Sequence, residues 1–367
     1  MKLIFYITIE FLKAIGLTAI GIIMLTLLLD GSDQANFMSS RGLPPINGLY
    51  NALYRLPDFL LKTMPLIILI SGMVTFIRLS KSLEIIAAKA SGFTFVHILI
   101  GPIFLTLMIG ILATGLLNPI TSITNSISNQ YLISLGVTKP SEIQLKSKGI
   151  FLREKIGSGY AIITADKINN IGTTLYNVKR LEFNNENVLI NRSQSPSSLL
   201  VENAWVLKDA TNWQNLTING IRKIKRSSYQ ELKFYTNITH EQILNSFSDP
   251  SMISVWNLPK FIQQLKNSGF EARKHLRYFY AELTRPLTLI AMLLIGCAFT
   301  STAVIRQPIS VIIVISLLSG FILYSFDRVI ASLADNNQLP ILLSSIGPPL
   351  CGIFLSLSIF IFREEMR

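Results

Sequence analysis

Few residues in this chain have the types and spacing that catalysis needs. Its three histidines, His97, His240 and His275, lie far apart, and none has the spacing of metal ligands. The sequence contains no G-x-x-x-x-G-K-[ST] phosphate loop, no G-x-S-x-G and no H-E-x-x-H. The Gly-Ser-Gly at 157–159 is too short for a phosphate loop and favours a hairpin turn. We therefore expect no catalytic residue, no metal and no cofactor on this chain.

Ionisable residues are sparse in the apolar part of the sequence. Asp327 and Arg328 end a long apolar stretch, where such groups are either interfacial anchors or markers of a substrate path. No run of Asp, Glu or His inside the apolar stretches offers a proton relay. A proton-coupled secondary transporter is therefore not favoured.

A short segment between two apolar stretches, SKSLEIIAAKASGF at 80–93, has the pattern of an amphipathic helix. The period of 3.6 residues predicts an apolar face made of Leu83, Ile86, Ala87 and Ala90. The opposite face would carry an acid and small side chains, namely Glu84, Ala88 and Ser91, with Lys81 nearby. Two interpretations are open: another protein binds this polar face, or the helix rests on lipid and Glu84 is simply solvated.

The elements that position these residues follow from composition. The 367 residues are 50% hydrophobic and only 15% charged, whereas soluble domains carry about 25% charged residues. Uncharged apolar runs occupy 14–29, 63–77, 98–117, 286–305, 307–326 and 340–362. A membrane span needs about 20 residues, which the last four runs supply unaided and the first two supply with their flanks. The sequence predicts six transmembrane helices. The first is expected to be retained, because no small-residue cleavage site follows it.

Orientation follows from Lys and Arg in the short loops. These residues cluster before the first span, between the second and third, between the fourth and fifth, and after the sixth. They are Lys2, Lys13, Arg78, Lys81, Lys89, Arg306, Arg363 and Arg367. One topology puts all of them in the cytoplasm. It places both termini inside and the long segment 118–284 outside, where a large domain is translocated largely regardless of its charge.

The outer segment changes from helical to strand-like patterning. Short alternating stretches separated by Gly, Asn and Ser predict strands near 159–168, 175–183, 187–192, 204–210, 216–224 and 231–238. Helical patterning returns with a stripe of Leu258, Phe261, Ile262 and Leu265 that ends at Gly269. The densest basic cluster, 222–226, favours a solvated strand edge over contact with anionic head groups. Both cysteines, Cys297 and Cys351, lie in predicted spans, so the outer domain has no disulfide.

The predicted fold is thus an α-helical membrane protein with six transmembrane helices, arranged 3+3, and an external all-β, jelly-roll-like domain. Residues 1–117 hold the first three spans and the cytoplasmic helix 80–93. Residues 118–284 form the outer β-rich domain with its helical return segment, and residues 285–367 hold the last three spans. This layout of three spans, a β-rich insert and three more spans is unusual.

Three stretches carry a resemblance to a known family. They are LPDFLLKTMPLIILISGMVTFIRLSKSLEIIAAKASGF at 56–93, FIQQLKNSGFEARKHLRYFYAELTRPL at 261–287 and GFILYSFDRVIASLADNNQLP at 320–340. In order and spacing they resemble the LptF/LptG (YjgP/YjgQ) family of lipopolysaccharide export permeases. The first and third look closer to its LptG branch, in PDFLLKTMPL and YSFDRV…LADNNQLP. The resemblance covers essentially the whole chain. It implies a permease subunit of an ABC transporter in the bacterial inner membrane, with the β-rich domain in the periplasm.

The resemblance also implies partners and site residues. A separate LptB-like ATPase dimer would hydrolyse ATP with Mg²⁺ and dock on the cytoplasmic helix. The apolar face of this helix, made of Leu83, Ile86, Ala87 and Ala90, would lie against the membrane-domain helices. The expected coupling residues are Lys81, Glu84, Ala88, Ser91 and Gly92. The first and fifth spans would face those of an LptF-like paralogue and line a lipid cavity, and the β-rich domain would pass the lipid to an LptC-like protein. The expected lipid-path residues are Ile23, Leu27, Ile313, Gly320, Tyr324 and Arg328.

Two rival functions remain at this stage. One is a lipoprotein-releasing or macrolide-type ABC permease, which has four spans with its domain after the first. The other is a non-transport scaffold or sensor that binds an envelope partner through the external domain. The number of spans separates the first rival, and the presence of an ATPase partner separates the second. No base-stacking aromatic pattern accompanies the basic cluster, so no nucleic acid partner is expected.

Overall fold

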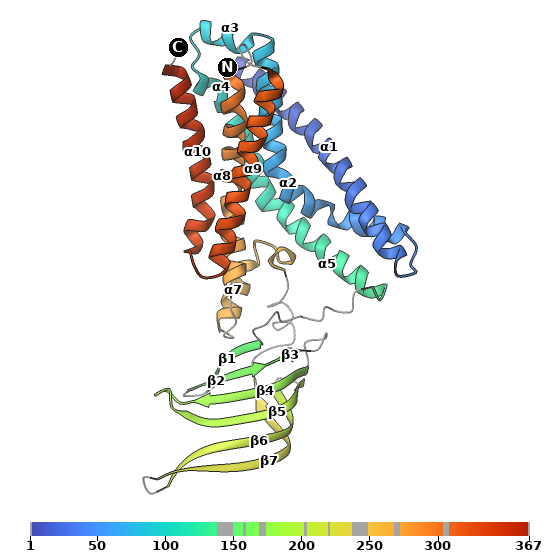
Figure 1. Ribbon diagram of the computed structural model, residues 1–367, viewed down its shortest axis with the longest axis vertical. Coiled ribbons are helices and arrows are strands. Elements are labelled where there is room, and N and C mark those ends of the chain that lie inside the picture. The colour runs from blue at the N-terminus through green and yellow to red at the C-terminus, as the bar shows by residue number, and fades with distance from the viewer. Residues whose placement is uncertain are drawn as a thin grey trace. The chain divides into compact units, whose positions relative to one another are not determined.

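The computed structural model describes residues 2–137, 150–156, 159–168, 174–201, 204–218, 221–236, 249–267, 272–303 and 308–365. Within these residues six helices are long and apolar enough to cross a membrane (Figure 1). The prediction of six transmembrane helices is confirmed. The predicted helix end at Gly269 and the basic residues Arg306 and Arg367 lie outside the described residues.

The first two spans are much longer than their uncharged runs. Helix α1 covers Lys2–Ser39 and α2 covers Ile46–Lys81, so both continue well past the predicted 14–29 and 63–77. Their added turns form a helical hairpin held by polar pairs: Arg55 lies 3.0 Å from Asp30, and the Asn51 amide donates to Gln34 over 2.8 Å. Gly48 permits this approach, because a Cβ there would lie 2.4 Å from the backbone of the opposite helix.

The third span is one continuous helix in three segments. It consists of α4 (Phe95–Leu112), the π-helical turn η1 (Ala113–Leu117) and α5 (Asn118–Ser134). The π turn contains one extra residue and contacts the fourth span. Thr114 in η1 donates its hydroxyl to the carbonyl of Glu282 over 2.9 Å. The helix therefore runs past residue 117, where the sequence predicted the span to end.

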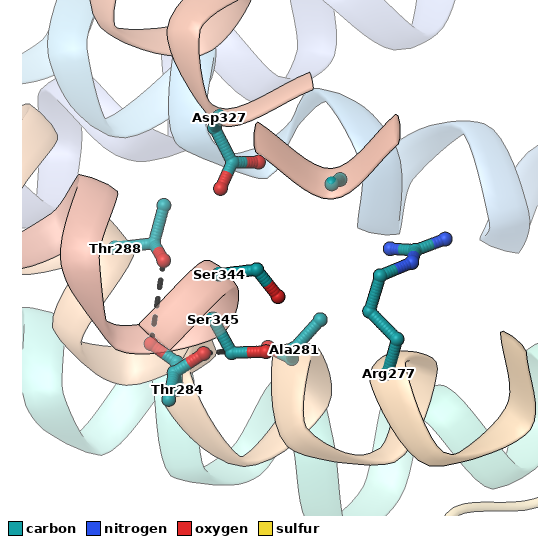
Figure 2. Close-up of a pocket in the computed structure, with 8 residues that line it drawn as sticks. Arg277, Ala281, Thr284, Thr288, Asp327, Ser344 and Ser345 are labelled. Carbon is teal, nitrogen blue, oxygen red and sulfur yellow. Dashed lines mark hydrogen bonds between the residues drawn. The ribbon is translucent and has the colours of Figure 1, made fainter. Parts of the chain in front are cut away.

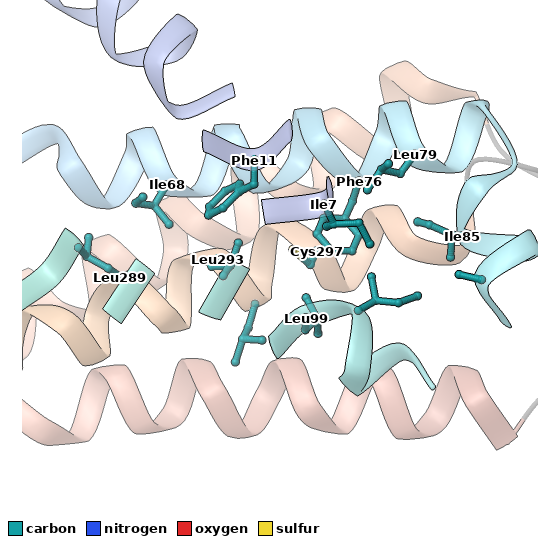
Figure 3. Close-up of a cluster of buried hydrophobic side chains, with 13 residues drawn as sticks. Ile7, Phe11, Ile68, Phe76, Leu79, Ile85, Leu99, Leu289, Leu293 and Cys297 are labelled. Carbon is teal, nitrogen blue, oxygen red and sulfur yellow. The ribbon is translucent and has the colours of Figure 1, made fainter. Parts of the chain in front are cut away.

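The remaining spans are α8 (Arg273–Ala303), α9 (Ile309–Asp335) and α10 (Ile341–Glu365). Pro286, expected at the start of the fourth span, lies inside α8. The centre of the helical unit is a cluster of buried apolar side chains from α1, α2, α3, α4 and α8, shown in Figure 3. Glycines bring α2 and α8 together, since the Leu293 side chain lies over Gly72 and the Leu69 carbonyl lies over Gly296.

The chain forms two compact units. One contains Met1–Gln130, Ser251–Trp256 and Lys274–Arg367, and the other contains Tyr131–Pro250 and Asn257–Arg273. Both ends of the second unit lie inside the predicted segment 118–284. The reason is that the third span continues as α5 and the fourth span begins early, at Arg273.

The second unit is built on one antiparallel sheet. Its strands are β1 (Ile150–Ile156), β2 (Gly159–Ala165), β3 (Lys167–Ile168), β4 (Thr174–Phe183), β5 (Leu189–Val201), β6 (Ala204–Ile218) and β7 (Ile221–Tyr235). The order β1-β2-β4-β5-β6-β7 follows the chain, and β3 pairs with β4 (Figure 1). The prediction of a β-rich domain between the third and fourth spans is thereby confirmed, and its described strands form a single curved, up-and-down sheet.

The single strand predicted at 216–224 is wrong, because its residues are divided between the end of β6 and the start of β7. The other strands match the predicted segments with two differences. First, β5, β6 and β7 are longer than predicted, because serines and asparagines that suggested turns lie instead within paired strands; Ser193 and Ser195, for example, are buried. Second, β1 pairs fully with β2, although 150–156 was not among the predicted strands. The buried core of the sheet includes Trp205 and Leu175.

Two further predictions for this unit can be checked. The basic cluster 222–226 lies on β7, which is the last strand of the sheet among those described, as a strand-edge cluster should. The predicted helical stripe forms α7 (Leu258–Asn267), in which Leu258, Ile262 and Leu265 are buried.

Candidate functional sites

The predicted coupling helix corresponds to α3, and the junction between α2 and α3 sets its direction. Helix α2 ends at Lys81, Leu83 adopts a left-handed conformation with φ of 61°, and α3 covers only Glu84–Ala90. An L side chain at positive φ is uncommon, so this residue marks a sharp change of direction. Glu84 stabilises the junction: its Oε1 accepts a hydrogen bond from the Ser82 hydroxyl over 2.7 Å and lies 3.5 Å from the Tyr6 hydroxyl of α1.

The face of α3 that packs on the membrane helices is not the predicted one. Ile85 and Ala88 are 4% and 5% exposed and join the buried cluster together with Leu79 and Ile98. Ile85 points into this cluster in Figure 3. The outward surface consists of Leu83, Ile86, Ala87 and Ala90, which were expected to face inward. The predicted inward face is therefore wrong.

The error has a physical cause. The periodicity argument treated 80–93 as one regular helix, but the left-handed Leu83 separates the last turn of α2 from the first turn of α3. The four predicted residues still share one face, but the break at Leu83 sets which face of α3 turns toward the membrane helices, and periodicity alone does not show this. The small side chain of Ala88 allows α3 to approach α4 and α1 closely, and it is not on the outer surface.

The end of α3 accounts for two of the predicted coupling residues. Gly92 has φ of 87° and follows the C-cap Ser91, while the Phe93 amide donates to the Ala88 carbonyl over 3.1 Å. This is the pattern of a helix that ends with a left-handed glycine. Ser91 is exposed and donates its hydroxyl to the Ala87 carbonyl over 2.9 Å. Lys81, at the end of α2, is also exposed.

The predicted lipid-path residues of α1, Ile23 and Leu27, are half-buried. The most exposed stripe of this helix lies beside them and consists of Leu17, Ile20, Met24 and Leu28. In the most apolar 18-residue stretch of α1, only 6% of the residues are buried. Helix α1 therefore presents a wide apolar surface outside the helical unit.

The predicted lipid-path residues of α9 divide into different environments. Ile313 and Tyr324 are half-buried, and exposed Arg328 donates to the Tyr324 hydroxyl over 2.7 Å. Gly320 is buried, and a Cβ there would lie 2.5 Å from Leu69 Cδ2, so its missing side chain makes room for α2 and not for lipid. The exposed stripe of α9 lies elsewhere, at Val314, Leu318, Phe321, Ile322 and Val329.

Two buried carboxylates with basic partners were not singled out from the sequence. Glu10 on α1 is 7% exposed and binds both Lys13 over 2.8 Å and Arg78 of α2 over 2.6 Å. Glu282 on α8 is 1% exposed and is bound by Arg285, whose Nη1 also donates to the Leu61 carbonyl over 2.8 Å. A sequence signal existed in both cases, since each pair is an acid in an otherwise apolar stretch with a base three residues later.

The two histidines that the structure describes show no metal-site geometry. His97 shares a 2.6 Å hydrogen bond with Thr94, His275 is buried in α8, and His240 lies outside the described residues. In the part of the chain that the structure describes, no three His, Cys, Asp or Glu side chains gather closely enough to hold a metal ion.

Within the described residues, six apolar helices in two sets of three, with a β unit inserted between them in the chain and exposed apolar faces on α1 and α9, define a multi-pass membrane protein. The model of the family described as lipopolysaccharide export system permease LptF/LptG matches residues 5–364. The chain therefore belongs to this family, whose members are transporters and not enzymes.

Individual relatives are distant. Over 122 residues the chain is 24% identical to the lipopolysaccharide export system permease protein LptG of Escherichia coli K12. The same identity and length apply to the protein of that name from Escherichia coli O6:H1. The aligned stretch covers 33% of this chain and 34% of either relative, so about a third of their length supports the likeness to LptG.

Proposed function

We propose that this protein is one permease subunit of an ABC transporter that extracts lipopolysaccharide from the inner membrane and passes it to a periplasmic bridge. Membership of the LptF/LptG family over 5–364 supports the transport of lipopolysaccharide, and the local likeness to LptG favours that branch. In this proposal the second permease half is an LptF-like paralogue. ATP and Mg²⁺ bind to a separate LptB-like ATPase dimer.

The observation that carries the proposal is the exposure of α1 and α9. Met24 on α1 is 62% exposed and Phe321 on α9 is 66% exposed, and both belong to continuous apolar stripes. A cavity for several acyl chains needs such walls, because a charged side chain in mid-membrane costs about 2.5–3.5 kcal/mol on insertion scales. In the proposed heterodimer these stripes face the paralogue across the lipid cavity.

Coupling to the ATPase is assigned to the outward surface of α3. Its exposed side chains are Leu83, Ile86, Ala87 and Ala90, beside the half-buried Glu84. An apolar patch next to one carboxylate fits a groove that offers apolar contacts and one basic residue. Lys81, Ser91 and Gly92 flank this surface. Movement of α3 would reach α1 through Glu84 and Tyr6, which lie 3.5 Å apart.

The β unit is assigned to the periplasm, where it would deliver the lipid to an LptC-like protein. The distribution of Lys and Arg in the short loops supports this orientation, with both termini in the cytoplasm. Of the rival functions, the four-span ABC permease is disfavoured by six candidate spans with the β unit between the third and fourth. A scaffold or sensor would have no ATPase partner, so identification of the proteins that co-purify with the tagged chain separates it.

Site-specific photo-crosslinking in the assembled transporter tests the proposal. A crosslinker at Met24 or Phe321 should form adducts with lipopolysaccharide, and the adducts should decrease when ATP drives the cavity closed. The matched control is Phe354 on α10, which is 65% exposed but outside the proposed path. Equal adducts at all three positions, unchanged by ATP, would mean that α1 and α9 only contact surrounding lipid, and the transport path would be refuted.

A further inference from the structure

A polar cavity lies between α8, α9 and α10, away from the apolar stripes and from α3. Its volume is about 60 Å³, and its lining is shown in Figure 2. A water molecule needs about 10–15 Å³ by the same measure, so the cavity has room for an ion together with one or more waters. The lining residues are Arg277, Ala281, Thr284, Thr288, Asp327, Ala331, Ser344 and Ser345.

The hydroxyl groups that line this cavity all use their protons in hydrogen bonds within their own helices. Each donates its proton to a carbonyl of its own helix: Thr284 to Tyr280 over 3.0 Å, Thr288 to Thr284 over 3.3 Å, Ser344 to Ile341 over 2.7 Å and Ser345 to Ile341 over 3.1 Å. A hydroxyl whose proton is used in this way presents only lone pairs to its other neighbours. The hydroxyls that line the cavity therefore act as acceptors.

Asp327 adds a negative charge to these acceptors. Its side chain points into the cavity toward Thr288 in Figure 2. Within the described residues no side chain donates a hydrogen bond to its carboxylate or lies within ion-pair distance of it. Two of the nearby cations are paired with other acids: Arg277, which also lines the cavity, binds Asp335 over 2.6 Å, and Arg285 binds Glu282. The third, Arg328, is exposed to solvent and donates to the neutral Tyr324 hydroxyl.

Apart from Arg277, which is paired with Asp335, the polar groups of the cavity are acceptor oxygens and the half-buried carboxylate of Asp327, which has no hydrogen-bond donor among the described residues. A buried acceptor without a donor costs free energy, and a buried charge costs more unless it is paired. Hard oxygen ligands suit hard cations, and a single carboxylate balances a single positive charge. We propose that this cavity binds one small monovalent cation, with Asp327 as its charged ligand and hydroxyl oxygens of the three helices as the others.

The ion would connect three helices of the second set of spans. Asp327 lies on α9, Thr284 and Thr288 on α8, and Ser344 and Ser345 on α10. Occupancy would therefore hold α9 against both neighbours at this end of the bundle. The site differs from the lipid path, because Asp327 faces the cavity while the exposed stripe of α9 faces outward.

Direct binding of radioactive sodium ions to the purified full chain, together with any partners that co-purify, tests the proposal. Choline chloride keeps the ionic strength constant. We expect saturable binding to the wild-type protein, loss of binding in Asp327→Asn, and affinity lowered at least about tenfold in Thr288→Val, which removes an oxygen but keeps the side-chain shape. Ser319→Ala is the matched control, since Ser319 lies on α9 outside the cavity and donates to the Ile315 carbonyl; its affinity should not change.

The readout is independent of lipid export, so its failure leaves the proposed transport function standing. Absence of saturable binding to the wild-type protein would mean that the cavity holds water only and would overturn the proposal. Wild-type affinity in Asp327→Asn would also overturn it. If Asp327→Asn unfolds in choline, Thr288→Val and Ser344→Ala decide, and unchanged affinity in both refutes the site.

Discussion

Glycines at the contacts of α2 fix how closely its neighbours approach. At Gly296 a Cβ would lie 2.6 Å from the Leu69 carbonyl, and at Gly320 it would lie 2.5 Å from Leu69 Cδ2. The first obstacle is backbone, which cannot move alone, whereas the second is the end of a flexible side chain. A single leucine thus meets α8 with its carbonyl and α9 with its side chain, so both contacts depend on missing Cβ atoms.

We expect Gly296→Ala to destabilise the protein by about 1–3 kcal/mol, because overpacking against backbone forces the helices apart. Gly320→Ala should cost less, since Leu69 can change rotamer. Gly16→Ala is the control: nothing lies within 4 Å of its added Cβ, and alanine favours the helix by up to about 1 kcal/mol. Thermal midpoints in detergent measure the order. A midpoint for Gly296→Ala at or above that of Gly16→Ala would contradict the close contact of α2 and α8.

Helix α3 illustrates how an element can be predicted while its orientation is not. Its existence, its acid and its terminal glycine all follow from the letters at 80–93. The face that it turns toward the membrane helices depends on the left-handed conformation of Leu83. A leucine does not predict this conformation, because glycine or asparagine usually occupies such positions. The lengths of α1 and α2 were underestimated for a different reason: the charged residues Asp30 and Lys62 ended the apolar runs, but they pair with Arg55 and Asp58 on α2 and do not end the helices.

Neighbouring isoleucines test the observed phase of α3. Ile85 is 4% exposed and Ile86 is 42% exposed, although they differ by one position. Ile85→Ala should cost about 2–5 kcal/mol, because it opens a cavity in the cluster of Figure 3. Ile86→Ala should change stability by no more than about 0.5 kcal/mol and instead weaken recovery of the ATPase partner. The comparison uses thermal midpoints and co-purification. The opposite order of stabilities would restore the predicted phase.

At the scale of the whole molecule the sequence is most informative about layout. Six spans, their division into threes and the β-rich insert follow from apolar runs and alternating stretches, since both patterns reflect local solvent contact. The polar cavity between α8, α9 and α10 could not be predicted, because Thr288, Asp327 and Ser344 meet only through helix packing. Their hydroxyls look like ordinary span residues until the directions of their hydrogen bonds are known.

Membrane orientation is the whole-molecule prediction that remains to be tested. Cysteines at Ser82, before α3, and at Asn185, in the exposed turn between β4 and β5, should be labelled differently by an impermeant thiol reagent on spheroplasts. We expect Ser82→Cys to be protected and Asn185→Cys to react, because the basic short loops stay in the cytoplasm. Both substitutions are made in Cys351→Ser, since Cys351 is exposed and Cys297 is buried. Reaction at Ser82→Cys in intact spheroplasts would invert the topology.

The contacts of Leu69 with Gly296 and of Gly72 with Leu293 also set the order of events during synthesis. The two sides of this seam are about 220 residues apart in the chain, with the β unit between them. At about 5–20 residues per second, α2 waits on the order of 10–40 s in the membrane before α8 is made. During that interval α2 exposes the surface around Leu69 and Gly72, which α8 covers in the finished protein. The length of the insert therefore determines how long the nascent protein is vulnerable to membrane proteases and to pairing with the wrong helix.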